Sequence, residues 1–323
     1  TLQYLMANSP PAPPSVQFID IRADQAGQRI DNFLITLEKG VPKSRIYRAL
    51  RKGEVRVNKG RIKQTYRLQA GDQVRVPPLR VSEKVVITEL SDSLTDALES
   101  AILMEDDDIL VINKPAGLAV HAGSQIQLGV IEAMRIIRPE NRFVELVHRL
   151  DRDTSGCLVL AKSRTALLNL QQQMKDSETD KRYLTLTRGK WPAQENIVDL
   201  ALQKNSLSSG ERMVVPDING KKSKTLFEVK QEFSGCQLVA AKLYTGRTHQ
   251  IRVHSASQSH PVAGDEKYGD REFNKRLRQF GLKRMFLHAW QLSLKHPITD
   301  EPLTFNAELP DTLKDVLKQL EKQ

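Results

Sequence analysis

The spacing of hydrophobic positions divides the chain into a small helical module followed by a longer region of mixed strands and helices. In the module, apolar residues of Gly27–Leu34 fall on one face of a predicted helix. A second helix is predicted over Arg45–Arg51, with Ser44 as its N-cap and Gly53 as its terminator. Short strands are predicted at Val55–Asn58 and Gln73–Val76.

In the longer region, short apolar runs alternate with amphipathic segments. Ile102–Met104 and Ile109–Ile112 predict a hairpin. The order of the elements favours an α+β domain over regular βαβ winding. Helices are predicted near Leu128–Ile137, Ser163–Met174 and Asp270–Phe280, and at the C-terminus with Asp311 as cap and an apolar stripe of Leu313, Val316, Leu317 and Leu320.

Shifts in composition give the predicted domain boundaries. Residues 1–16 are rich in Pro, Ser and Ala and are expected to be a disordered tail. Residues 17–80 form the compact basic module, and residues 81–100, which are punctuated by proline and then acidic, are interpreted as a linker. Residues 101–323 form the second domain.

Composition narrows the class of protein. The chain has 323 residues, 39% of them hydrophobic and 27% charged, with a net charge of +10. This excess of positive charge indicates a polyanionic partner such as nucleic acid. No apolar run approaches membrane-spanning length, and no secretory signal is visible. The two cysteines, Cys157 and Cys236, each lie in a predicted strand, so we expect reduced thiols and a cytoplasmic protein.

The basic charge of the first module is concentrated on its second helix. Arg45, Arg48 and Lys52 share a flank that points away from the core in the predicted helix, and Glu54 is the only acidic residue between positions 41 and 67. A solvated helix face usually mixes both signs, so incidental charge is the less favoured alternative. Such a one-sided face is suited to phosphates and gives salt-sensitive binding.

The most unusual polar segment is His148–Gly156. It holds two carboxylates, two guanidinium groups and an imidazole between two predicted strands, Phe143–Val147 and Cys157–Ala161. Charged residues where a connection crosses the end of a sheet are a common setting for catalysis. The alternative is an ordinary surface turn with solvated charges, and polar segments downstream weigh against it.

Further polar segments accompany other predicted strands: Asn113–Gly117, Lys181–Tyr183, Thr245–His254 and His260–Asp265. Taken singly, each is more easily explained as a turn or a structural side chain. The histidines do not match a metal-binding pair, and a cysteine-based zinc site is excluded. No Gly-x-Gly-x-x-Gly motif follows a predicted strand, and no Gly-x-x-x-x-Gly-Lys-Ser/Thr motif occurs. The absence of these phosphate-binding motifs argues against nucleotide cofactors.

Together and in order, these segments resemble the motifs of the RluA-type pseudouridine synthase family, and Leu287–Ala289 fits as well. The N-terminal module resembles the S4 RNA-binding domain in its helix pair, in Arg51–Asn58 and in Ala70–Asp72. The resemblance implies a mixed or antiparallel sheet in the second domain. Three stretches, Val41–Ser44, Arg51–Asn58 and Tyr268–Phe273, narrow it to members that act on large-subunit (23S) ribosomal RNA.

The resemblance also implies roles for individual residues. Asp151 takes the place of the catalytic carboxylate, and Arg252 that of its guanidinium partner, which keeps it ionised and oriented. Tyr183 matches the tyrosine whose ring packs on the uracil and whose hydroxyl could move the C5 proton. Arg149 matches the arginine that fills the space left by a flipped-out base. Asp153 is interpreted as structural, closing the turn before Ser155–Gly156. Contacts with phosphate or with the rest of the fold, but no catalytic role, are expected of Lys114, Arg247, His249 and His260.

The predicted activity is therefore isomerisation of specific uridines to pseudouridine in large-subunit ribosomal RNA, free or within a pre-ribosomal particle. No cofactor, metal or membrane is expected, and a monomer is the default. One alternative is a non-catalytic RNA-binding assembly factor, which accounts for the charge but not for Asp151, Tyr183 and Arg252. Another is an S4-linked RNA methyltransferase, which the missing glycine-rich loop disfavours.

Overall fold

The computed structural model describes residues 15–38, 41–79, 89–122, 128–176, 178–193, 196–206 and 212–322. The chain forms two compact units, residues 1–86 and 87–323, and each is described by itself. The predicted disordered tail, apart from residues 15 and 16, lies outside the described residues.

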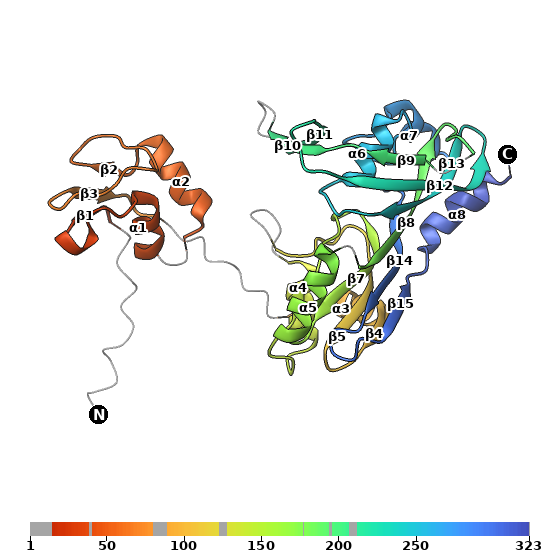
Figure 1. Ribbon diagram of the computed structural model, residues 1–323, viewed down its shortest axis with the longest axis horizontal. Coiled ribbons are helices and arrows are strands. Elements are labelled where there is room, and N and C mark those ends of the chain that lie inside the picture. The colour runs from red at the N-terminus through yellow and green to blue at the C-terminus, as the bar shows by residue number, and fades with distance from the viewer. Residues whose placement is uncertain are drawn as a thin grey trace. The chain divides into compact units, whose positions relative to one another are not determined.

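The N-terminal unit packs two helices on a three-stranded antiparallel sheet of order β1–β3–β2 (Figure 1). Its apolar core includes Ile30, Ile46 and Val74, which are fully buried. The helix faces and the two strands predicted from the sequence are therefore confirmed. The elements are β1 Gln17–Asp20, a short 3-10 turn at Ala23–Gln25, α1 Ile30–Leu37, α2 Lys43–Lys52, β2 Arg56–Val57 and β3 Gln73–Val76.

Helix α2 starts earlier than predicted. Pro42 is its N-cap, so the expected capping role of Ser44 is wrong, because Ser44 already lies inside the first turn. Proline suits the start of a helix because its missing N–H would have no partner there. Gly53 ends the helix as predicted, with φ 69°, a left-handed conformation that glycine adopts without steric cost.

The expected linker is shorter than predicted. Residues 80–88 lie outside the described part of the chain, but Asp92–Ser100 forms helix α3, capped by the Ser91 hydroxyl. Leu98 of this helix is fully buried in the main core of the C-terminal unit. The acidic composition of the segment hid a single apolar face, so residues 92–100 belong to the second domain.

The C-terminal unit is built on a ten-stranded sheet with the path β4–β5–β7–β14–β8–β13–β12–β9. Strand β15 pairs with β14, and β6 pairs with β7. Every pairing in this sheet is antiparallel except that of β7 with β14, so the sheet is mixed and the predicted α+β class is confirmed. The strands are β4 Ile102–Glu105, β5 Ile109–Lys114, β6 Glu145–Leu146, β7 Ser155–Ala161, β8 Asp180–Arg188, β9 Asn196–Asp199, β12 Lys224–Phe233, β13 Cys236–Leu243, β14 Leu287–Lys295 and β15 Pro302–Asn306.

Helices cover both faces of this sheet (Figure 1). Alternate residues of each strand enter different cores: Leu158 and Leu160 pack with α3, α4 and α6, whereas Val159 packs with α5. Helices α7 and α8 form a further core on the face of the sheet that α5 also covers, around Leu186 and Phe286. The helices are α4 Val130–Ile137, α5 Arg164–Lys175, α6 Gln250–Ser257, α7 Arg271–Arg278 and α8 Asp311–Leu320, and a separate hairpin joins β10 Leu202–Ser206 to β11 Arg212–Pro216.

The predicted helices near 128–137, 163–174 and 270–280 are confirmed, with Ser163 and Asp270 as N-caps. Asp311 is the first residue of α8 rather than its cap, which is Pro310. Helix α6 was not predicted, because its hydrophobic and polar residues do not follow a clear helical period. None of the described helices combines the length and apolar character needed to cross a bilayer.

Glycine is required where β7 meets β14. Gly156 has φ 114°, and a Cβ there would lie 2.2 Å from the carbonyl oxygen of Ala289. Ser155 and Gly156 belong to strand β7, so this strand begins two residues earlier than the predicted Cys157. This close approach sets the position of the connection that precedes β7.

Candidate active site

The connection between β6 and β7, residues 147–154, carries the charged loop that the sequence singled out. Leu150 is buried in the main core and anchors the loop. The backbone N–H of Thr154 donates to the carbonyl of Asp151 at 3.1 Å, which forms a tight turn. The Asp151 side chain that emerges from this turn is 23% exposed. The carboxylate thus lies at the surface of a recess, on a backbone that is fixed on both sides.

Arg252 of α6 links Asp151 to a second carboxylate. Its Nη1 lies 3.2 Å from Asp151 Oδ2, as expected for a pair, but the contact is single rather than bidentate. The bidentate contact is made with Asp265, at 2.7 Å from Nε to Oδ2 and 2.9 Å from Nη2 to Oδ1. Asp265 is fully buried and also accepts the backbone N–H groups of Lys267 and Tyr268. The sequence did not identify this role of Asp265, which lies thirteen residues beyond its partner.

The charges of this triad support one another. Burial disfavours the charged form of Arg252, but the two carboxylates outweigh it and hold the pKa of Arg252 above its ordinary value. Burial likewise opposes ionisation of Asp265, yet Arg252 and two backbone N–H groups keep the pKa of Asp265 below its usual range. Arg252 therefore stays cationic beside Asp151.

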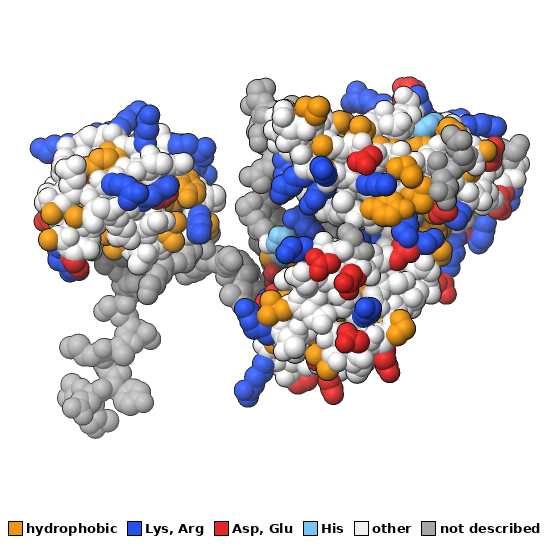
Figure 2. Space-filling view, in the orientation of Figure 1, with side chains coloured by type: hydrophobic (Ala, Val, Ile, Leu, Met, Phe, Trp, Pro, Cys, Tyr) orange, Lys and Arg blue, Asp and Glu red, His pale blue; other side chains and the backbone are white. Residues whose placement is uncertain are grey.

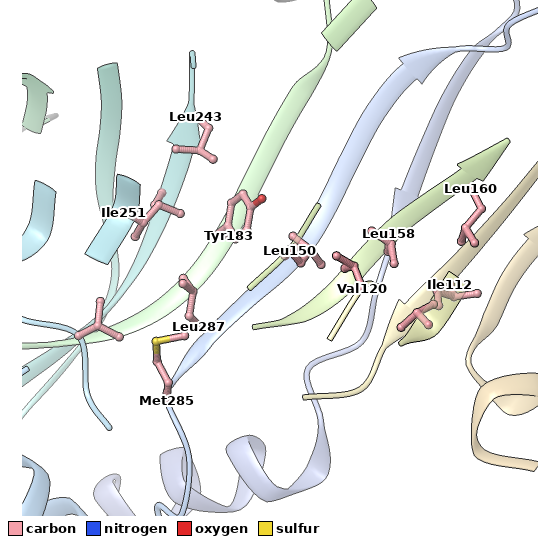
Figure 3. Packing of buried hydrophobic residues seen from close by; sticks show 14 of the residues in the cluster. Ile112, Val120, Leu150, Leu158, Leu160, Tyr183, Leu243, Ile251, Met285 and Leu287 are labelled. Carbon is pink, nitrogen blue, oxygen red and sulfur yellow. The ribbon is translucent and has the colours of Figure 1, made fainter. Parts of the chain in front are cut away.

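Tyr183, on β8, lies in the apolar part of the recess. Its ring is buried among Leu150, Leu243, Ile251 and Leu287 (Figure 3). Burial, and then the negative charge of Asp151, raise the pKa of Tyr183 above its ordinary value. The hydroxyl therefore stays protonated at neutral pH. An aromatic ring with apolar neighbours, next to a carboxylate, is suited to hold a flat heterocycle.

His249 and Tyr268 complete the surroundings of Asp151. Nε2 of His249 lies 3.7 Å from Asp151 Oδ2, and Nδ1 lies 2.9 Å from the hydroxyl oxygen of Tyr268. That oxygen also accepts the backbone N–H of Val214 at 2.9 Å. The Tyr268 ring lies under the Arg252 guanidinium, with the centroid 5.0 Å from Cζ. The sequence gave no reason to place Tyr268 here, and His249 was expected only to support the fold or contact phosphate.

Asp151 lines two adjoining pockets. One, of about 110 Å³, holds Tyr183 and is also lined by Arg149 and His249. The other, of about 740 Å³, is open and is lined by more cations than carboxylates. Its cationic side chains are Arg149, Arg152, Arg252, Lys267, Arg278, Lys283 and Arg284. A small aromatic pocket beside a larger basic one is suited to a nucleic-acid base attached to its negatively charged phosphodiester backbone.

The remaining charges of the loop are exposed. Arg149 is exposed at the rim of both pockets, which is consistent with contact to RNA. Asp153 is exposed, and its carboxylate contacts the exposed Arg152 at 3.3 Å. The sequence predicted that Asp153 closes this turn. Its side chain does not do so, because the turn is closed by the backbone groups of Asp151 and Thr154. His148 accepts the backbone N–H of Val159, and burial lowers its pKa to about 4.

Lys114 holds the loop from below. It is fully buried, and its Nζ donates to the carbonyls of Pro115, Leu118 and Arg152 at 2.8, 2.8 and 3.1 Å. Burial lowers the pKa of Lys114 to about 7. Of the two roles expected from the sequence, the structure therefore favours support of the fold over contact with phosphate.

Arg284 supports the other side of the loop. Its Nη2 donates to Ser155 Oγ at 2.9 Å and to the carbonyls of Asp153 and Leu287 at 3.3 and 3.2 Å. Burial lowers the pKa of Arg284 to about 10. This residue was not identified from the sequence, because it lies in the loop before β14 and meets the active-site loop only through the fold.

Two other residues named from the sequence contact the backbone: Arg247 also lines the small pocket with Asp151, whereas His260 lines neither pocket. Arg247 is exposed, and its Nε donates to the carbonyl of Lys222 at 3.0 Å. His260 stacks on Trp191 with ring centroids 4.4 Å apart and contacts the carbonyl of Arg188 through Nδ1. Both contacts support the fold.

In the N-terminal unit, the predicted basic flank is only partly free. Arg48 and Lys52 are exposed, but Arg45 is half-buried and donates to Glu54 at 2.8 Å. Figure 2 shows Lys and Arg side chains over the visible face of this unit, with few acidic ones. Arg48 and Lys52 are therefore better placed than Arg45 to meet phosphates.

Three possible metal ligands gather elsewhere in the C-terminal unit: Asp106, Asp108 and His296. Their atoms are already engaged in the fold. Asp106 accepts the backbone N–H groups of Asp108 and Ile109 and contacts His296 Nε2 at 3.1 Å. His296 Nδ1 accepts further backbone N–H groups. The cluster joins two turns, and nothing in it points to an ion.

Comparison with known proteins matches both units. The family model for RNA pseudouridylate synthase matches residues 108–257, and the S4 domain model matches residues 28–74. The ribosomal large subunit pseudouridine synthase C of Haemophilus influenzae is 52% identical over 95% of this chain and 95% of its own length. The protein of the same name from Escherichia coli K12 is 53% identical over 95% of this chain and 97% of its own.

Solved structures agree. Human RNA pseudouridylate synthase domain containing 4 superposes with a TM-score of 0.60 at 27% identity, covering 71% of this chain and 96% of that one. Human RNA pseudouridylate synthase domain containing 1 gives 0.53 at 26% identity, covering 69% and 95%.

Proposed function

Because this chain belongs to the RNA pseudouridylate synthase family, with an S4 domain at its N-terminal end, we propose that it converts specific uridines of large-subunit (23S) ribosomal RNA to pseudouridine. The observation that carries the proposal is the Asp151 carboxylate, held by Arg252 at the junction of a small aromatic pocket and a larger basic one. The relatives' printed names support the substrate.

The reaction needs a carboxylate at the sugar. The N1–C1′ bond of uridine breaks, the uracil rotates, and a C5–C1′ bond forms while the proton on C5 leaves and N1 gains one. Asp151 either attacks C1′ or removes a sugar proton to give a glycal, and both routes need an ionised, oriented carboxylate. Arg252, anchored by Asp265, supplies the positive charge and the orientation.

Tyr183 is proposed to hold the detached uracil. Its ring forms a wall of the small pocket, where the freed base must turn without escaping. Since the raised pKa of Tyr183 keeps the hydroxyl protonated, the ring is its main contribution. A role in moving the C5 proton would require the hydroxyl to pass on one proton as it takes another.

The target uridine is proposed to be flipped out of its helix before it reacts. The small pocket can hold a base but not a duplex, so the base must leave its stack, at a cost of a few kcal/mol. Arg149 stands exposed at the rim, where it can occupy the space that the base leaves. Arg48 and Lys52 of the S4 domain would add sequence-independent phosphate contacts.

A non-catalytic RNA-binding factor remains the rival proposal, and it predicts no need for Asp151. Incubation with RNA labelled with tritium at uridine C5 separates the two, because pseudouridine formation releases that tritium to water. The purified chain should release tritium in proportion to the pseudouridine formed, and Asp151→Asn should bind the RNA without release. Release by Asp151→Asn at the rate of the unsubstituted chain would refute the proposal.

The proposed reaction involves no cofactor, metal or second subunit, and the protein is proposed to act on ribosomal RNA in the cytoplasm.

A further inference from the structure

His249 occupies a strained backbone position beside Asp151. Its φ of 55° and ψ of 22° lie in the left-handed region, which is strained for a residue other than glycine. The turn that imposes this conformation is fixed by the buried side chain of Gln250, which accepts from Arg247 N at 2.9 Å and from Thr245 Oγ1 at 2.8 Å. Such strain persists only where the surroundings hold it, and here it directs the imidazole toward Asp151.

The hydrogen bonds around Tyr268 favour one nitrogen of His249 as the carrier of its hydrogen. The Tyr268 oxygen accepts the N–H of Val214 at 2.9 Å. A phenol has one hydrogen of its own, and the acceptor within reach is Nδ1 of His249, also at 2.9 Å. When the phenol donates to Nδ1, the imidazole carries its own hydrogen on Nε2, the atom that lies 3.7 Å from Asp151 Oδ2.

We propose that His249 and Tyr268 are positioning residues for the Asp151 carboxylate. Tyr268 fixes His249 in the Nε2–H tautomer, and Nε2–H together with Arg252 Nη1 directs Oδ2, so that Oδ1 is the oxygen presented to the nucleotide. The 3.7 Å separation exceeds a hydrogen bond, and contacts of this kind commonly shorten when the substrate binds. This inference rests on the proposed catalytic role of Asp151.

The charges around His249 fit a neutral donor. It faces Asp151, Arg252, Lys267 and Asp265, and burial is the largest influence, so the pKa of His249 lies below its ordinary value. A neutral imidazole can orient the carboxylate without forming a second full ion pair with it. Such a pair would reduce the reactivity of the carboxylate.

Tyr268 contacts both groups that orient Asp151. Its hydroxyl bonds to His249, and its ring lies under the guanidinium of Arg252. The backbone N–H that completes the chain comes from β11, which belongs to a hairpin outside the main sheet. The Tyr268 side chain therefore holds both the imidazole of His249 and the guanidinium of Arg252 in place.

The tautomer can be measured directly by NMR on the full chain with ¹⁵N-labelled histidine. The His249 signals are identified by their loss in His249→Gln, and His260→Gln is the matched control, because that imidazole binds a backbone carbonyl elsewhere. At pH 7.5 the unsubstituted chain should show His249 neutral, with hydrogen on Nε2. In Tyr268→Phe the same signals should shift toward a mixture of tautomers and should titrate at higher pH.

Activity gives the second measurement. Tyr268→Phe should lower kcat by about tenfold to a hundredfold with KM for RNA within about twofold, because only the geometry at Asp151 changes. His249 in the Nδ1–H or imidazolium form in the unsubstituted chain, or Tyr268→Phe with unchanged kcat, would overturn the inference. Retained activity in Asp151→Asn would refute the proposed function instead, while the tautomer measured at His249 would stand.

Discussion

Arg252 contacts Asp151 through Nη1, 3.2 Å from Oδ2, while its Nε and Nη2 are both held by Asp265. The guanidinium is therefore anchored to a fully buried carboxylate and reaches a half-buried one. The orientation of the proposed catalytic group depends on a residue that lies behind Arg252. This dependence gives the first prediction.

Asp265→Asn should impair both folding and catalysis. Removing one partner of a buried ion pair leaves the other charge uncompensated and costs about 3–5 kcal/mol of stability. Loss of orientation at Asp151 should also lower kcat by about a hundredfold. Urea unfolding and single-turnover rates measure the two effects.

The matched control is Asp153→Asn, since Asp153 is exposed and its partner Arg152 is exposed as well. This substitution should change stability by less than about 0.5 kcal/mol and leave the rate within twofold. If Asp265→Asn behaved like Asp153→Asn, the anchoring role of Asp265 would be wrong.

Substitutions of Tyr183 should separate its ring from its hydroxyl. Tyr183→Phe keeps the ring that lines the small pocket and should retain activity within about tenfold. Tyr183→Ala should abolish turnover and lower the free energy of unfolding by about 3–5 kcal/mol, because it opens a cavity in the core. Because the pKa of Tyr183 is raised, the rate should show no tyrosine ionisation up to pH 10. A Phe variant as inactive as the Ala variant would instead assign the chemistry to the hydroxyl.

The sequence was most informative about the residues around Asp151 and least informative about what holds them. The pairing of Asp151 with Arg252 followed from the family resemblance, and so did the expectation that Tyr183 lies in the same site. The bidentate contact of Arg252 with Asp265 could not be predicted. The loop after α6 folds back so that Asp265 contacts this helix, and the spacing of the two residues in the sequence does not indicate such a contact.

The fold shows a similar division. Helix faces and strands with a regular period, such as α1, α2 and β5, agree with prediction. Where one buried residue decides, the sequence misled: Leu98 draws an acidic segment into the core as α3. Helix α6 follows the strained N-cap residue His249. Its sequence shows no clear helical period, because polar as well as apolar residues lie on its buried side. Gln250 and His254 are examples.

His288 should make the C-terminal unit sensitive to acid. It is fully buried, bonded to Ser155 Oγ and to the Ala307 carbonyl, and burial lowers its pKa to about 4. Between about pH 6.5 and pH 4 the unfolded chain binds a proton that the folded chain does not, so stability falls as the pH is lowered. His288 should account for about 3 kcal/mol of this loss.

Urea unfolding of the unsubstituted chain and of His288→Gln, at pH 7 and pH 4.5, tests this. The glutamine variant should be less stable at pH 7 but should lose less stability between the two values. Equal losses in both proteins would contradict the assignment to His288.

In the N-terminal unit, replacement of Arg48 and Lys52 by alanine should weaken RNA binding and flatten its dependence on salt. Two lost phosphate contacts reduce the slope of log K against log salt by about 1.4–1.8. Arg45→Ala should have a smaller effect, because Arg45 is paired with Glu54. Filter binding of a ribosomal RNA fragment at several salt concentrations gives these slopes. An unchanged slope in the double variant would show that this flank does not meet the RNA.

The central claim, that Asp151 makes pseudouridine in large-subunit ribosomal RNA, is tested most directly by mapping pseudouridine in cells. Carbodiimide-blocked primer extension would be applied to ribosomal RNA from cells that lack this chain and are supplied with the unsubstituted protein, Asp153→Asn or Asp151→Asn. We predict that the first two restore particular pseudouridines and that Asp151→Asn restores none of them, although it is present at the same level and binds RNA. Restoration of the same sites by Asp151→Asn would contradict the account.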